Sequence, residues 1–68
     1  MGLYYIVTKG DPPGNDGSAT RGAVCARWAE SPDKANTEVV EVDLSGNVIR
    51  RFSQVESESI AHKFNNPI

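Results

Sequence analysis

Cysteine and histidine each occur only once in this sequence of 68 residues, as Cys25 and His62. A single cysteine excludes a disulfide within the chain, and two such side chains are too few for a zinc site of cysteines and histidines. A chain this short buries only about 60% of the surface that it exposes when unfolded, so its core is small. The fold therefore depends on close local packing or on association with another chain.

A long apolar run and an excess of basic side chains are also lacking. The first ten residues, MGLYYIVTKG, have no basic region before a short apolar run, so we expect no signal peptide, and no run approaches the roughly 18 residues of a membrane span. A lone cysteine without an export signal fits a reducing compartment, and we expect a soluble, cytoplasmic protein. The net charge is −2 and the basic residues form no stripe, which disfavours nucleic-acid binding.

A catalytic set cannot be assembled from this inventory. Cys25 could act as a nucleophile only beside a base, and His62 lies far along the chain on the polar side of a predicted helix. We predict that Cys25 is a buried small side chain and that His62 is exposed. The sequence therefore predicts no enzyme, no cofactor and no metal site.

The segment Leu3 to Thr8, LYYIVT, is rich in aromatic and β-branched residues and predicts a strand. Leu3, Tyr5 and Val7 would point to one face. Tyr4 and Ile6 would point to the other, so both faces are apolar. Such a strand is usually covered on both sides, and we expect the second cover to be another subunit or a partner.

The next apolar segment, GAVCARWAES, fits two structures. As a strand it would place Val24, Ala26 and Trp28 on one face. As a helix it would gather Val24, Cys25, Trp28 and Ala29 on one side. We favour a strand, because Gly22 would fall in the first helical turn and Ser31-Pro32 would end the helix after only about nine residues.

The segment TEVVEVDLSGNVIRRFS, residues 37–53, predicts a β-hairpin. Two β-rich runs flank DLSGN, which suits a type I turn with Gly46 in the left-handed conformation. Pairing Asp43 with Asn47 would set Val42 opposite Val48, and Val40 opposite Arg50. One face would then carry Val40, Val42, Val48 and Phe52, and the other Val39, Ile49 and Arg51 beside Glu41 and Asp43. A slip of one residue would exchange these sets, so the register stays open.

Near the C-terminus, Ser53 with Glu56, or Ser57 alone, can cap a helix. Ile60 and Phe64 would share its apolar side, and Asn65-Asn66-Pro67 would end it. We therefore predict one α+β domain over residues 1–68, with an antiparallel meander of three to four strands and one C-terminal helix packed on it. The alternative order is strand–helix–hairpin–helix.

The segment GDPPGNDGSATRG, residues 10–22, predicts a long exposed loop. It lacks the lysine of a phosphate-binding P-loop and the glycine spacing of a dinucleotide site. Its two prolines make it stiffer than a glycine linker, and stiff exposed loops of this length are often functional. It is either a plain connection between two strands or a loop that contacts a partner.

From these features we expect a small non-enzymatic protein that acts by protein–protein interaction. Its size suggests an accessory or inhibitory protein of a phage or other mobile element that binds a host protein; a homodimer is a second assembly to consider. The predicted contact residues are Asp11, Asn15, Asp16, Arg21, Trp28 and Tyr4.

For Trp28 a place in the core is the competing prediction.

Two other functions stay open. One is a nucleic-acid-binding module that uses an aromatic and arginine-bearing sheet face. The other is a small enzyme or ligand carrier whose site is built at a subunit interface.

Overall fold

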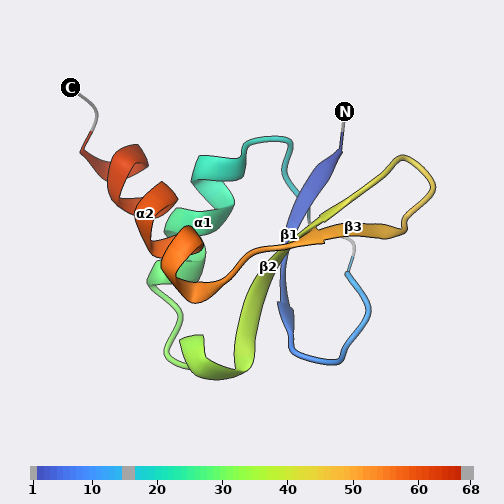
Figure 1. Cartoon of the computed structure of the whole chain (residues 1–68), viewed down its shortest axis with the longest axis horizontal. Coiled ribbons are helices and arrows are strands. Elements are labelled where there is room, and N and C mark those ends of the chain that lie inside the picture. The colour runs from blue at the N-terminus through green and yellow to red at the C-terminus, as the bar shows by residue number, and fades with distance from the viewer. Residues whose placement is uncertain (1, 15–16, 67–68) are drawn as a thin grey trace.

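A computed structural model describes residues 2–14 and 17–66 and shows an α+β fold (Figure 1). The chain runs through strand β1 (Leu3–Thr8), helix α1 (Arg21–Ala29), the short 3-10 helix η1 (Lys34–Asn36), strands β2 (Thr37–Val42) and β3 (Val48–Arg51), and helix α2 (Gln54–Asn65). The three strands form one antiparallel sheet in the order β1-β2-β3. The two helices lie together on one side of this sheet, with α1 against the sheet and α2 against α1.

The segment that we preferred as a strand is helix α1, so that prediction is wrong and the alternative order, strand–helix–hairpin–helix, is correct. The helix has no side-chain cap and no acidic residue in its first turn. Tertiary packing decides its conformation, because its buried side, Val24, Cys25 and Trp28, fills the space between the sheet and α2. With residues 20–31 removed from the sheet, the meander has three strands rather than four.

The main core lies between the sheet and the helices. Its buried members are Val24, Cys25, Trp28, Val39, Phe52 and Ala61. Tyr4 and Ile6 pack against them from β1, and the ring of Tyr4 meets that of Phe52 edge to face at 6.1 Å. One face of β1 is therefore apolar because its side chains, Tyr4 and Ile6, pack into this core.

The opposite sheet face is also buried, although in the described ranges no helix covers it. Val7, Val40 and Val42 form a second cluster there, with Tyr5 and Val48 packed against it. The connection between β1 and α1 supplies part of the cover, because a Cβ placed on Gly17 would lie only 2.5 Å from the ring of Tyr5. The expected second cover, another subunit or a partner, is thus supplied in part by the chain itself.

The hairpin turn is confirmed in detail. The Asp43 N–H donates to the carbonyl of Asn47 at 2.9 Å, Val42 stands opposite Val48, and Gly46 has a φ of 86°. The carboxylate of Asp43 accepts the backbone N–H groups of Ser45 and Asn47, both at 2.9 Å. The side chain thus holds the turn in place as an Asx-turn does.

Beyond the turn, the predicted register fails at a β-bulge. Val48 pairs with Val42 and Arg50 with Glu41, which leaves Ile49 as an extra residue in β3. Because one extra residue reverses the faces of all that follow, Arg51 stands opposite Val40. Phe52, which we placed with Val40, Val42 and Val48, joins Val39 in the core beneath the helices.

Helix α2 begins as predicted. The Ser53 hydroxyl accepts the backbone N–H of Glu56 at 3.1 Å, and the helix ends at Asn65 with Asn66 as its C-cap. Ala61 is buried and Ile60 half-buried, whereas Phe64 is 48% exposed and lies over Gly22 of α1. Gly22 is therefore a site of close helix–helix contact, because a Cβ there would meet the Phe64 ring at 2.5 Å.

We predict that Gly46→Ala lowers the free energy of unfolding by about 1 kcal/mol, because alanine is strained at a positive φ. No atom lies within 4 Å of a Cβ placed there, so the loss comes from the backbone alone. Urea denaturation measures it. Gly46→Asn is the matched control and should lose less, since asparagine tolerates this conformation. Equal losses for the two variants would contradict this account.

We predict that acid weakens the turn through Asp43. The N–H groups of Asn47 and Ser45 hold the pKa of this carboxyl below its usual range. Because the folded-state pKa lies below the unfolded value of about 4, the stabilisation is present above that value and is lost as the pH falls through the folded-state pKa. Urea midpoints at pH 7 and pH 3 should therefore fall further in the wild type than in Asp43→Asn. Identical falls would show that Asp43 contributes nothing.

Candidate functional site

A pocket of about 170 Å³ lies at the end of the sheet where β1 finishes and β2 begins. Its lining comes from segments far apart in the sequence: Lys9, Trp28, Thr37, Phe52, Ser53 and Gln54. Trp28 and Phe52 border the pocket, but both are almost completely buried and expose little surface to it. The remaining lining is polar and includes one basic and one acidic residue, Lys9 and Glu38.

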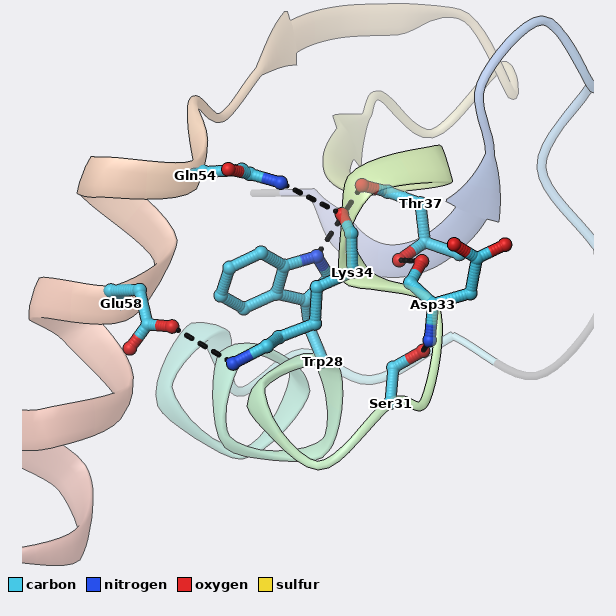
Figure 2. Close-up of polar contacts among 7 residues, drawn as sticks. All are labelled: Trp28, Ser31, Asp33, Lys34, Thr37, Gln54 and Glu58. Atoms are coloured by element: carbon cyan, nitrogen blue, oxygen red, sulfur yellow. Dashed lines mark hydrogen bonds and ion pairs between the residues drawn. The ribbon is translucent and has the colours of Figure 1, made fainter.

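The indole of Trp28 is fixed by polar groups around its edge (Figure 2). Its Nε1–H donates to the carbonyl of Thr37 at 3.4 Å, and the Thr37 hydroxyl donates to the carbonyl of Asp33 at 3.0 Å. A buried tryptophan requires such a partner for its N–H. Thr37, which lies at the junction of η1 and β2, therefore sets the orientation of the indole.

Two bonds tie η1 to α2 beside the indole. The amide of Gln54 donates to the carbonyl of Lys34 at 3.0 Å, and the Lys34 ammonium donates to Glu58 at 3.1 Å (Figure 2). The ammonium also lies 5.6 Å from the centre of the indole ring. Lys34 thus spans the indole and links the 3-10 helix to α2.

The acidic side chains near the pocket are paired. Glu38 accepts from Arg51 at 2.6 Å, Glu56 pairs with Arg50, and Glu58 pairs with Lys34. Arg50 and Arg51 face opposite sides of the sheet, because Arg51 is opposite Val40 and Arg50 is opposite Glu41. Lys9, in contrast, forms no ion pair within the described ranges.

The predicted contact residues are not gathered at one place. Trp28 is buried, which confirms its place in the core, and Tyr4 packs against the same core. Asp11 and Arg21 are exposed, at the start of the β1–α1 connection and at the first position of α1. Asn15 and Asp16 lie outside the described residues. Contact of Asp11 or Arg21 with a partner stays a prediction.

The connection between β1 and α1 is tied to the edge of the sheet. Ser18 and Tyr4 exchange two backbone hydrogen bonds, at 2.8 and 3.0 Å, on the side of β1 away from β2. The Asp11 N–H donates to the carbonyl of Thr8 at 2.9 Å. The predicted loop over residues 10–22 is shorter than expected, since Arg21 and Gly22 belong to α1.

Exposed apolar side chains occur at the opposite end of the sheet from the pocket. Leu3 is 38% exposed, Ile49 57% and Leu44 89%, and we name these three residues the hairpin-end surface. Leu3 pairs with Val42, which begins the turn, so all three lie at the same end. Leu44 is unusual in the turn DLSGN, because polar residues are typical of such turns. This departure is a sequence signal for an exposed apolar side chain.

Cys25 and His62 lie in different environments and do not form a catalytic pair. Cys25 is completely buried, and burial raises the pKa of its thiol, with Arg21 and the hydroxyl of Ser57 acting in the opposite direction. His62 is exposed in the last turns of α2. Both placements agree with the predictions for these side chains.

Neither a cluster of metal ligands nor a membrane-spanning helix occurs in the described part of the chain. It contains no group of three or more His, Cys, Asp or Glu side chains placed to hold a metal ion. None of its helices has the length and apolar composition that a membrane crossing requires.

Comparison of the chain with protein-family models, with curated proteins and with solved structures finds no match.

We predict that the Cys25 thiol reacts with DTNB at least about a hundredfold more slowly in the folded protein than in guanidinium chloride, because its sulfur is reached only when the core opens. Absorbance at the thionitrobenzoate band follows the reaction. The double variant Cys25→Ala/Ser59→Cys carries its thiol on the exposed side of α2 and is the control. Equal rates for the two folded proteins would refute the buried placement.

Proposed function

We propose that this chain is a non-enzymatic protein that acts by binding another protein through the hairpin-end surface. The observation that supports the proposal is the exposure of Leu44, Ile49 and Leu3 at one end of the sheet, whereas the other exposed large apolar side chains of the described ranges, Val55 and Phe64, lie at opposite ends of α2. Burial of a fully exposed leucine or isoleucine contributes about 1.5–3 kcal/mol. Two such side chains at the centre of a contact would account for a large part of a moderate affinity.

Strand addition is a less suitable binding mode for this sheet. β3 is short, bulged and ends in two arginines, which are features that protect an edge from pairing. β1 is bonded to Ser18 on its outer side. We therefore expect the partner to contact side chains at the end of the hairpin rather than the backbone of an edge strand.

Nucleic-acid binding has less support. Three aromatic residues could stack on bases, Tyr4, Tyr5 and Trp28. Tyr4 and Trp28 pack into the core, and Tyr5 packs against the second cluster, on the opposite face of the sheet. Arg50 and Arg51 are engaged by acidic side chains of the same chain and point to opposite faces. The narrower role, an accessory or inhibitory protein of a mobile element acting on a host protein, would follow from the identity of the partner.

We predict that Leu44→Ser/Ile49→Thr weakens partner binding by about a hundredfold, because it removes two exposed apolar contacts. Cross-linking and affinity capture from source cells, followed by titration with the identified protein, provide the measurement. Val55→Ser is the matched control, since Val55 is 80% exposed but lies on α2. Its binding should equal that of the wild type.

Three results would overturn the proposal. The first is equal binding by the hairpin-end variant and the wild type, and the second is capture of no defined protein by any form. The third is a homodimer as the only assembly found by native mass spectrometry, with the dimer unaffected by both variants.

A further inference from the structure

The end of the sheet that carries the hairpin-end surface is acidic. Residues 41–49, which form the turn and the strand positions on either side of it, contain two charged side chains, Glu41 and Asp43. A carboxylate oxygen of Glu41 lies 3.1 Å from the position of a Cβ placed on Gly2, the residue that precedes β1. Asp43 directly precedes Leu44 in the turn. Both carboxylates therefore border the exposed apolar side chains at this end.

These two negative charges are not neutralised within the described ranges. Neither Glu41 nor Asp43 takes part in an ion pair there. Arg50 stands opposite Glu41, but its guanidinium pairs with Glu56 of α2 and lies 4.6 Å from the centre of the Phe52 ring. The Asp43 carboxylate accepts backbone N–H groups of its own turn, which leaves its charge in place. A partner at this end therefore meets two carboxylates beside apolar side chains.

The carboxylates distinguish between the partners that an exposed apolar surface can take. A second copy of the chain in a two-fold contact would bring Glu41 and Asp43 of one chain against the same residues of the other, and such a meeting of like charges is unfavourable. An anionic membrane or a nucleic acid would be repelled for the same reason. A protein surface with basic side chains around an apolar site has the complementary charge.

We infer that the partner of the hairpin-end surface is a basic protein surface, in which Lys or Arg side chains border a shallow apolar site; the inference rests on the proposed function. Leu44 and Ile49 would enter the apolar site, and Glu41 and Asp43 would face its basic border. Apolar anchors at the centre of a contact supply most of the affinity, whereas charges at its border act on the association rate and on the choice of partner.

Two synthetic peptides serve as probes of this preference. Each has about 18 residues, which is long enough to form a helix, with leucine along one side and either lysine or glutamate on the other. Titration into the ¹⁵N-labelled chain, followed at the backbone cross-peaks of Leu44 and Ile49, gives a dissociation constant for each peptide. The lysine peptide should bind the wild type about tenfold more tightly than the glutamate peptide. Comparing this ratio between protein variants cancels any difference in helicity between the peptides.

The variant Glu41→Lys should lower the preference for the lysine peptide about tenfold, because it reverses one of the two charges. Glu30→Lys is the matched control, since it changes the net charge equally. Glu30 is the exposed C-cap of α1, at the end of the sheet where Trp28 bonds to Thr37, and its replacement should alter the preference by less than about twofold. Unfolding midpoints establish that both variants fold. Glu41→Gln against Glu30→Gln repeats the comparison without a reversed charge, with an expected change of about threefold.

Equal preferences in Glu41→Lys and Glu30→Lys would overturn the inference, as would tighter binding of the glutamate peptide by the wild type. Absence of a saturable shift with the lysine peptide up to about 1 mM would also overturn it. A homodimer that Leu44→Ser/Ile49→Thr dissociates would assign a second copy as the occupant instead. The proposed function fails by a different result, which is binding of the lysine peptide by Leu44→Ser/Ile49→Thr as tightly as by the wild type.

Discussion

The burial of Trp28 is the interaction on which most of this fold depends. Helix α1, strand β2, the short helix η1 and the start of α2 all meet at its indole. An uncapped helix of nine residues is too short to be stable alone, so α1 exists because its buried side is packed between the sheet and α2. The same indole borders the pocket. The packing of the core and the position of the pocket therefore depend on one side chain.

Local signals in the sequence predicted the parts of the fold that are determined locally. The turn at Gly46, the Asp43–Asn47 pairing and the Ser53 cap each depend on residues within a few positions of one another. α1 was misassigned because Val24, Cys25 and Trp28 suit either structure until their neighbours in space are known. The faces of β3 were misassigned because a bulge depends on cross-strand packing, and a single extra residue, Ile49, moved Phe52 into the core.

The candidate sites also divide into features that can be seen in the sequence and features that form only in the folded chain. Leu44 could have been noticed in the sequence, because a leucine is unusual in a polar turn. The pocket could not, since Lys9, Trp28 and Gln54 meet only after the chain has folded. The ion pairs also form only in the folded chain. Arg50, Arg51 and Lys34 are each engaged by an acidic group from another element of the fold.

The position of β1 in the sheet has a consequence for the order in which the molecule forms. β1 pairs with β2, and the whole of residues 9–36, including α1, lies between them. The hairpin and the helices close short loops, whereas the β1–β2 pairing closes a long one and carries a larger entropic cost. During synthesis LYYIVT also leaves the ribosome before its pairing strand exists. β1, which is made before β2 and β3, is thus the last of these three strands to pair, and until then its apolar side chains stay exposed to chaperones and to other chains.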